Sequence, residues 1–358
     1  MKKVLHICNL GMNGKAVFVS NLLNATDFDK YEVTILNFWG QVAEPIAKRL
    51  EGLPVRIINP IGRGFFNFVR DLNTLLKAEK FDVVHSHMWD LSGIFLTIAK
   101  WYGVPVRVAH SHNSQKVQGR YNLVKEFVRD KLVWNILKYA IEKNANRYLS
   151  CSDLAANWLY TNRLVQMGGV NIVNNGIDLK VFSPNDNKES SDTILFVGRF
   201  LHQKNPSFAY EVFKVYKQKH ANAKFIMVGG GDGEAQKQME KQAKNDGLQD
   251  AITFVGSTSE IHEYYRNADV LLMPSFYEGL PLTLVEAQAC GTRCLVSDTV
   301  TKECDCGLIQ YKSLHDGAES WAQTLEDIRK VDLKINKERL NQFSSLNTAE
   351  SVYKIYNR

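Results

Sequence analysis

Short runs of β-branched and other apolar residues alternate along the chain with longer segments that have helical periodicity. In the first half the apolar runs are residues 4–8, 33–36, 55–59, 82–87, 106–112, 147–152 and 171–176. Segments such as 16–24 and 66–78, with apolar residues spaced three and four apart, lie between most of these runs. This alternation predicts a parallel sheet covered by helices on both faces.

The alternation stops once and then resumes. Residues 183–193 (SPNDNKESSDT) are polar apart from one proline, a composition typical of a linker. New apolar runs follow at 193–199, 224–230, 252–257, 269–275 and 293–298. The pattern predicts two Rossmann-like, doubly wound α/β domains facing each other across a cleft, with domains at 1–182 and 193–340 and a linker at 183–192.

Composition narrows the class of protein. Hydrophobic residues make up 45% and charged residues 23%, and we expect no apolar run to span a bilayer. The N-terminal apolar run is broken by His6 and Asn9, so it indicates a strand and not a signal peptide. The six cysteines are scattered, and Cys304 and Cys306 have no second pair at zinc-site spacing, which favours reduced thiols in a reducing compartment.

The net charge of +6 is unevenly distributed. Residues 1–180 carry +9 and residues 181–358 carry −3. The basic first half indicates an anionic partner, for which a membrane surface and a phosphorylated substrate both qualify. We expect no nucleic-acid partner, because the chain has no recognised nucleic-acid motif.

Two glycine-containing turns follow strands of the second half. In FVGRFLHQKNP (196–206), Gly198 permits close backbone approach, and Arg199 with Lys204 forms a cationic pair suited to a diphosphate. The alternative is a pair of solvated surface cations. In MVGGGDGEAQ (227–236), backbone N–H groups around Gly230 and Gly231 precede a helix from about residue 234 and can face an anion. A tight turn without a ligand is the alternative there, and no acid is placed for a nicotinamide ribose.

Two glutamates lie eight positions apart in PSFYEGLPLTLVEAQACG (274–291). Glu278 precedes a Gly279-Leu280-Pro281 turn, and Glu286 lies within the following helix, in whose first turn we expect Pro281. Carboxylates placed in this way can accept hydrogen bonds from hydroxyl groups, although an acid that only caps the helix is common. The whole P-S-x-x-E-G-x-P pattern with E-x7-E is more specific than either acid alone.

Two His-x-His pairs end strands of the first half. They are His85 with His87, and His110 with His112. Such histidines can bond sugar or phosphate oxygens. Zinc is an alternative, although no carboxylate or cysteine completes a familiar ligand spacing, and hydrogen-bonded core histidines are another interpretation for His85 and His110.

The loop after the first strand carries Asn13-Gly14-Lys15. Gly14 permits a positive φ, so we expect the turn to face the cleft, unless Gly14 is an ordinary loop glycine.

Taken together, these blocks resemble the family 4 glycosyltransferases with the GT-B fold, in particular those of bacterial exopolysaccharide and capsule synthesis. The resemblance covers nearly the whole chain and extends to NNGID (174–178) and SDTVTKE (297–303). It implies an acceptor-side first domain, a nucleotide-sugar-binding second domain and a C-terminal helix at 341–358 that crosses back to the first domain.

The resemblance implies a retaining, metal-independent transfer of a hexose-type sugar from a nucleoside diphosphate sugar, with uridine the commonest base and no cofactor. The catalytic residues it implies are His112, Arg199, Lys204 and Glu278. The donor-binding residues it implies are Gly14, Lys15, Gly198, Gly230, Gly231, Gly279, Leu280 and Glu286. Three positions depart from the family pattern: Lys15 replaces a glycine, Val17 an acid and Thr301 a proline.

We expect a lipid-linked saccharide acceptor and a cytoplasmic protein at the inner face of the membrane. Residues 62–72 interleave Phe65, Phe66 and Phe68 with Arg63 and Arg70, and residues 116–148 are rich in basic and aromatic residues. Such surfaces can lie on anionic bilayers, but amphipathic helices packed on a sheet give the same pattern.

Other activities remain open. A non-catalytic GT-B partner subunit and a nucleoside-diphosphate-sugar epimerase share the fold. A two-carboxylate hydrolase is disfavoured, because Glu278 and Glu286 are placed for different parts of one ligand and not across one bond.

Overall fold

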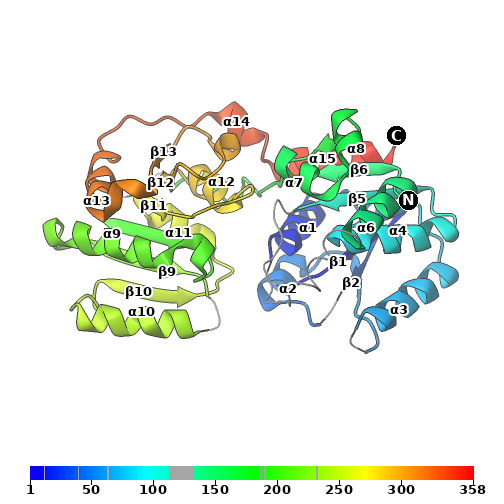
Figure 1. Ribbon diagram of the computed structural model, residues 1–358, viewed down its shortest axis with the longest axis horizontal. Coiled ribbons are helices and arrows are strands. Elements are labelled where there is room, and N and C mark those ends of the chain that lie inside the picture. Colours follow the sequence, from blue (N-terminus) through cyan, green and yellow to red (C-terminus); the bar gives the residue numbers. More distant parts are fainter. Residues whose placement is uncertain are drawn as a thin grey trace. The chain divides into compact units, whose positions relative to one another are not determined.

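The computed structural model describes residues 1–11, 13–38, 40–62, 64–112, 133–185, 187–188, 191–230 and 233–358. The chain divides into two compact units, residues 1–176 with 345–358 and residues 177–344. Each unit is a parallel sheet with helices packed on both faces (Figure 1). The two Rossmann-like α/β domains predicted from the sequence are confirmed.

The first unit contains a sheet of seven described strands in the order β3-β2-β1-β4-β5-β6-β7. The strands are β1 (Lys2–Cys8), β2 (Tyr31–Asn37), β3 (Val55–Ile58), β4 (Val83–Ser86), β5 (Val106–Ser111), β6 (Arg147–Ser150) and β7 (Asn171–Ile172). The helices are α1 (Gly14–Asn24), α2 (Glu44–Leu50), α3 (Phe65–Ala78), α4 (Ser92–Trp101), α6 (Trp134–Asn144), α7 (Asp153–Leu159), α8 (Asn162–Gln166) and α15 (Ser345–Tyr356), with a 3₁₀ turn η1 (Trp89–Leu91).

The second unit contains a sheet of six described strands in the order β10-β9-β8-β11-β12-β13. The strands are β8 (Thr193–Val197), β9 (Lys224–Val228), β10 (Ile252–Gly256), β11 (Val270–Met273), β12 (Arg293–Ser297) and β13 (Ile309–Lys312). The helices are α9 (Pro206–Lys219), α10 (Glu234–Asn245), α11 (Ile261–Asn267), α12 (Leu282–Ala289), α13 (Gly317–Asp327) and α14 (Lys337–Asn341), with 3₁₀ turns η3 (His202–Lys204), η4 (Lys302–Cys304) and η5 (Leu314–Asp316). The apolar pattern did not predict β13.

Strand alternation separates two cores in the first unit. On β1, Val4 and Cys8 belong to the core that includes residues of α1 and α15, whereas Leu5 and Ile7 belong to the core on the opposite face. His6 lies between Leu5 and Ile7 and therefore points to the α1 and α15 face. This periodicity decides on which side of the sheet the histidines of the unit gather.

The boundary between the units falls at residue 176 and not in the polar segment 183–192. Ile177 and Phe182 are buried in a core of the second unit, and the Ile177 N–H donates to the Phe343 carbonyl at 2.7 Å. The following polar residues are therefore surface of the second unit. The sequence had no signal for this, because burial of two apolar residues decides it.

The C-terminal helix α15 completes the first unit. Tyr353 stacks on Tyr31 with ring centroids 4.2 Å apart, and the Thr348 hydroxyl donates to the Asn174 carbonyl at 2.9 Å. Among the described residues, no helix combines the length and the apolar character needed to cross a membrane.

Gly229 holds a close crossing between the ends of β8 and β9. Its φ is +130°, and a Cβ there would lie 2.0 Å from the Gly198 carbonyl oxygen. Gly233 also has a positive φ, of +81°, but a Cβ there would meet nothing within 4 Å.

We therefore predict that Gly229→Ala lowers the free energy of unfolding by about 3 kcal/mol or more, through backbone strain and collision. The control Gly233→Ala should cost about 1 kcal/mol, the strain alone. Urea unfolding followed by circular dichroism measures both, and equal losses would contradict the collision.

Candidate active site

Two loops meet at the carboxyl edge of the second sheet. They follow β8 and β11, neighbouring strands at the point where the strand order reverses, which is where open α/β sheets bind ligands. The Lys204 Nζ atom lies 2.7 Å from Glu278 Oε1, with side chains 17% and 8% exposed. The structure thus pairs two predicted site residues directly with each other.

Further contacts fix the same two loops together. The Phe276 N–H donates to the Gln203 carbonyl at 2.9 Å, and the Gln203 side-chain amide donates to the Tyr277 carbonyl at 3.0 Å. The His202 ring stacks on Phe276 at 4.6 Å between centroids. Lys204 and Glu278 are therefore held by a scaffold and not only by their mutual attraction.

Arg199 and Gly198 lie at the start of the first loop. Arg199 is exposed, and within the described ranges no hydrogen bond or ion pair engages its guanidinium. A Cβ at Gly198 would come within 3.2–3.3 Å of the Lys204 side-chain carbons. Because glycine has no Cβ, the aliphatic part of the Lys204 side chain can lie against the backbone at Gly198. The close approach predicted for Gly198 is therefore made by this lysine side chain.

Glu286 is held inside the second unit. It lies in the second turn of α12, is 7% exposed, and accepts a hydrogen bond of 3.0 Å from the Tyr265 hydroxyl. Burial, together with the Glu286 charge, raises the pKa of Tyr265 well above its usual value, so the phenol keeps its proton and remains a donor. Tyr265 is a supporting residue that the motif analysis missed.

The turn before α12 differs in one detail from the prediction. Pro281 is the N-cap of α12 and not a residue of its first turn, because its ψ of 102° is extended. Gly279 and Leu280 are half-buried beside Glu278 in sequence. The hydroxyls of Ser275 and Thr283 flank this turn, and both are buried without a hydrogen-bond partner in the described part of the chain.

Gly230 precedes α10 and is half-buried, while Gly231 lies outside the described residues. Helix α10 begins at Glu234, as predicted. The N-cap of α10 is Gly233, in a left-handed conformation with φ +81°.

The first unit buries a cluster of five histidines on the α1 and α15 face of its sheet. The members are His6, His85, His87, His110 and His112. Four of these rings are fully buried, and only His112 is partly exposed. Period-two alternation puts both members of each His-x-His pair on one face, and His6 pairs in register with His85.

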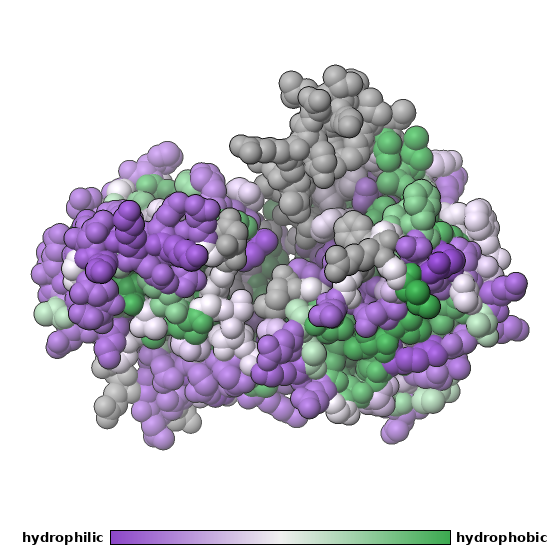
Figure 2. Space-filling model, turned by 90° about the horizontal axis from the view of Figure 1, so that it is seen from below, coloured by the Kyte–Doolittle hydropathy of each residue, from purple (hydrophilic) through white to green (hydrophobic). Residues whose placement is uncertain are grey.

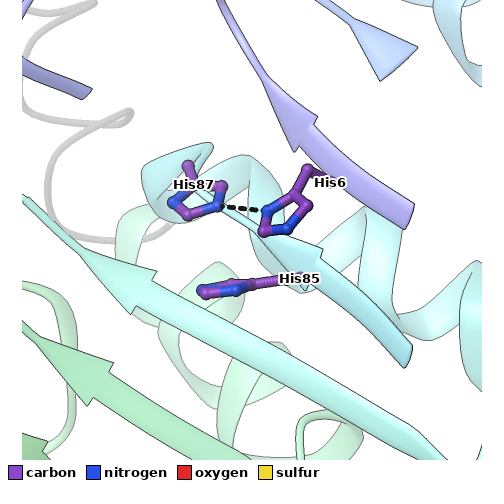
Figure 3. Close-up of side chains that lie close together, drawn as sticks. All are labelled: His6, His85 and His87. Carbon is purple, nitrogen blue, oxygen red and sulfur yellow. Dashed lines mark hydrogen bonds between the residues drawn. The ribbon is translucent and has the colours of Figure 1, made fainter. Parts of the chain in front are cut away.

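The rings form two hydrogen-bonded lines. In one line, His6 Nδ1 lies 3.0 Å from His87 Nε2, and His87 Nδ1 lies 2.8 Å from His112 Nε2. In the other, the Tyr356 hydroxyl lies 2.6 Å from His85 Nδ1, and His85 Nε2 lies 3.1 Å from His110 Nδ1. Figure 3 shows His6 and His87 joined in this way, with His85 stacked on His87.

Burial keeps these imidazoles neutral. Desolvation lowers the pKa of His6 and of His110 to about 3, and it holds the pKa of His87 and His112 well below the usual value. His85 and His110 are therefore hydrogen-bonded histidines of the core, which was one of the interpretations of the sequence. His87 is a third such residue. Two groups of three, His6/His85/His87 and His87/His110/His112, bring ring nitrogens within 4.8 Å of one another, so the four histidines weighed for zinc do lie together.

Lys15 lies beside this cluster at the start of α1. It is 7% exposed, and its Nζ lies 3.9 Å from the centroid of the Trp89 ring, which is a cation–π contact. Desolvation lowers the pKa of Lys15 to about 8. Asn13 caps α1 through a hydrogen bond from the Ala16 N–H, and the Trp89 indole nitrogen is buried without a partner among the described residues.

The chain belongs to the family 4 glycosyltransferases of the GT-B fold. Residues 12–181 match the family model for Glycosyltransferase Family 4, and residues 180–305 match that for Glycosyl transferases group 1. The chain is 32% identical to "Putative glycosyltransferase EpsF" of Bacillus subtilis (strain 168), over 90% of this chain and 87% of that protein. The resemblance predicted from the motifs is confirmed.

A second relative and a solved structure add detail. The chain is 27% identical to the "UDP-Gal:alpha-D-GlcNAc-diphosphoundecaprenol alpha-1,3-galactosyltransferase" of Escherichia coli, over 65% of this chain and 62% of that protein. The fold of this chain matches that of Anabaena Alr3699/HepE in complex with UDP, with a TM-score of 0.74 and 12% identity over 99% of both chains.

The buried histidines predict a strong acid dependence of stability. Because the folded pKa of His6 and of His110 is about 3, below the ordinary 6.5, only the unfolded chain binds these protons between the two values. Stability should therefore fall as pH drops below 6.5, by about 1.4 kcal/mol per pH unit for each neutral histidine. Urea unfolding between pH 7.5 and 4.5 measures the slope.

The variant His6→Asn should lessen that slope by about 1.4 kcal/mol per pH unit, since one proton fewer is involved. The exposed His315→Asn is the control and should leave it unchanged. An unaltered slope in His6→Asn would show that the His6 ring is charged in the fold.

Proposed function

We propose that the protein transfers a hexose-type sugar from a nucleoside diphosphate sugar, with UDP as the nucleotide, to a lipid-linked saccharide in surface polysaccharide synthesis. The transfer retains the anomeric configuration and requires no metal ion or cofactor. The observation that carries this proposal is the ion pair of Lys204 and Glu278 at the carboxyl edge of the second sheet, beside the exposed Arg199.

This arrangement suits a diphosphate sugar. Lys204 and Glu278 neutralise each other through their ion pair, and Arg199 adds one positive charge. A diphosphate adds negative charge that Arg199 and Lys204 can share, since arginine binds two oxygens at once and lysine acts as a point charge. Glu278 is then available to accept from the hydroxyls of the donor sugar, and Glu286 accepts from the ribose.

The chemical step depends on electrostatic stabilisation. A diphosphate leaves readily once its growing charge is neutralised, and two fixed cations provide that neutralisation. One leaving phosphate oxygen takes the proton of the acceptor hydroxyl on the same face of the sugar, which preserves the configuration. No carboxylate is needed as an acid or base, so Glu278 and Glu286 can both serve as ligand anchors.

The first unit has candidate ligand contacts of its own. We assign to His112 a ring nitrogen for a sugar hydroxyl, and to Lys15 with the α1 N-terminus a cation and the Gly14 N–H for phosphate oxygens. The buried Lys15 ammonium supports this assignment, because within the described ranges no carboxylate forms an ion pair with it.

The proposed acceptor is lipid-linked. The Escherichia coli relative is named for a diphosphoundecaprenol-linked acceptor. The first half of this chain is basic, and Figure 2 shows hydrophobic residues gathered in one area of the first unit, while the visible face of the second unit is mostly hydrophilic. Large exposed apolar side chains of the first unit include Ile61, Phe66, Trp101, Ile136 and Tyr139.

One part of the expected membrane surface is corrected. Phe68 is fully buried and Phe65 packs partly into the same core, so of the three α3 phenylalanines only Phe66 is exposed, at 86%. Phe65 and Phe68 instead lie on the apolar face of the amphipathic helix α3, which packs on the core. Arg63 and residues 113–132 lie outside the described residues.

The transfer itself is tested with UDP-hexoses and a polyprenyl-diphosphate-linked saccharide, with product mass and anomeric configuration read by mass spectrometry and NMR. An α-linked product from an α-linked donor supports the proposal. Epimerised donor without transfer, or UDP binding without turnover, would replace it with the epimerase or the partner-subunit activity.

The variant Arg199→Ala should lower kcat by about 10²- to 10³-fold, because one cation that stabilises the leaving diphosphate is lost. Arg199→Lys should retain part of the activity, since the charge remains and the two-oxygen grip is lost. Steady-state kinetics with the UDP-hexose found active measures both. A near-normal kcat in the alanine variant would contradict the role of Arg199 in binding the diphosphate.

Binding to vesicles tests the membrane proposal. The wild-type protein should float with anionic vesicles, and Phe66→Asp should bind about tenfold more weakly, because an exposed aromatic side chain no longer inserts. Val331→Asp, at an exposed apolar position of the second unit, is the matched control and should float like the wild type. Absence of wild-type flotation would remove the proposal.

A further inference from the structure

One line of hydrogen-bonded rings in the first unit ends at a proposed catalytic residue. His6 Nδ1 meets His87 Nε2 at 3.0 Å, and His87 Nδ1 meets His112 Nε2 at 2.8 Å. Figure 3 shows the first of these bonds. Both ring nitrogens of His87 are therefore engaged, and only the outer nitrogen of each end ring remains: His6 Nε2 and His112 Nδ1.

Proton counting restricts this line to two states. A neutral imidazole carries one N–H, and each hydrogen bond in the line needs one proton. If His6 donates from Nδ1, His87 donates from its own Nδ1, and His112 must carry its proton on Nδ1. If the direction reverses, His112 donates from Nε2 and His6 is left with an N–H on Nε2. The tautomer of His112 is thus fixed by a ring two places away.

The surroundings of the end rings favour the first state. His6 Nε2 is buried without a hydrogen-bond partner among the described residues, and an unpaired lone pair is more easily tolerated inside a protein than an unpaired N–H. At the other end, desolvation lowers the pKa of His112, and the Asn175 side chain opposes part of that lowering, as an acceptor does. Both ends therefore favour a proton on His112 Nδ1.

The outer nitrogen of His112 has unused hydrogen-bonding capacity. His112 Nδ1 and Asn175 Oδ1 are buried atoms without a hydrogen bond in the described part of the chain, and the His112 ring as a whole is the only partly exposed ring of the five. Phe18 packs against the ring of His112 at 4.9 Å between centroids and limits its rotation.

We propose that His87, backed by His6, is a positioning residue that locks His112 in its Nδ1–H tautomer. His112 then offers a bound ligand a hydrogen-bond donor and not a base. The identity of that ligand, the sugar donor, rests on the proposed function, whereas the tautomer lock does not.

Ring orientation favours this lock over a metal centre made from the same residues. Histidine binds a metal through a lone pair in the plane of the ring, so ligand rings must aim at one point. His85 instead stacks on His87 at 4.1 Å between centroids with planes 28° apart, and His110 stacks on His112 at 4.0 Å. The closely placed nitrogens of His6 and His87 lie at hydrogen-bond distance, 3.0 Å, from each other.

The test is ¹⁵N NMR of protein labelled at its imidazole nitrogens, which distinguishes the two neutral tautomers from imidazolium. We expect wild-type His112 as a single neutral Nδ1–H tautomer at pH 7. In His87→Phe we expect a mixture of tautomers. Tyr356→Phe is the matched control: it removes the bond to His85 in the other line and should leave the His112 signals unchanged.

Activity gives a second readout. His87→Phe should lower kcat about tenfold, the value of one misplaced hydrogen bond, and His87→Gln should recover part of this loss because an amide can both accept and donate. Three results would each overturn the lock. They are wild-type His112 protonated on Nε2, an unchanged His112 tautomer in His87→Phe, and one tightly bound metal ion per chain detected by mass spectrometry. If His87→Phe does not fold, the wild-type tautomer still decides.

An inactive wild-type enzyme with the expected tautomer would refute the proposed function and leave the lock standing. The two proposals therefore fail separately.

Discussion

The ion pair of the candidate site depends on one constraint: strands of a parallel sheet end at the same edge. In the second unit the strand order reverses between β8 and β11, so the loops after these two strands share that edge without a helix between them. Lys204 and Glu278 are 74 positions apart in sequence, yet one ion pair of 2.7 Å joins them. Glycine is favoured at position 198 because it has no Cβ, and a Cβ there would crowd the side-chain carbons of Lys204.

Strand alternation imposes a second constraint, which explains the histidine cluster. A His-x-His pair places both rings on one face of a sheet, and neighbouring strands in register bring a second pair alongside. Five imidazoles then occupy an interior where a charge is costly, so they remain neutral and use their nitrogens on each other. Stacking and hydrogen bonding satisfy most of the buried polar atoms without any counter-charge.

Sequence alone predicts the elements well and the pairings poorly. Apolar runs located the strands because buried parallel strands are nearly continuous in Val, Ile and Leu, whereas β13 escaped because IQYK has only one aliphatic residue. His6 was missed as a cluster member because its proximity to His85 follows from strand order and register. Lys204 and Glu278 were predicted individually, but their pairing depends on how two loops pack. The boundary between the units is set by Ile177 and Phe182, which are buried in the second unit. The sequence shows that these residues are apolar but not in which unit they are buried.

Lys15, at a position where the family resemblance implies a glycine, acquires a physical meaning beside the histidines. A buried ammonium is stabilised either by a carboxylate or by a ligand with negative charge, and the described neighbours of Lys15 include neutral imidazoles, an indole and the Cys8 thiol. Trp89 offsets part of the desolvation cost through its ring face, and it holds a positive φ of 51° at that position. The pKa of Lys15 near 8 reflects the remainder, and a bound phosphate would raise it again. A donor proton on His112 Nδ1 agrees with this balance, because a neutral N–H beside an ammonium can serve an anionic oxygen, whereas a bare nitrogen lone pair would repel it.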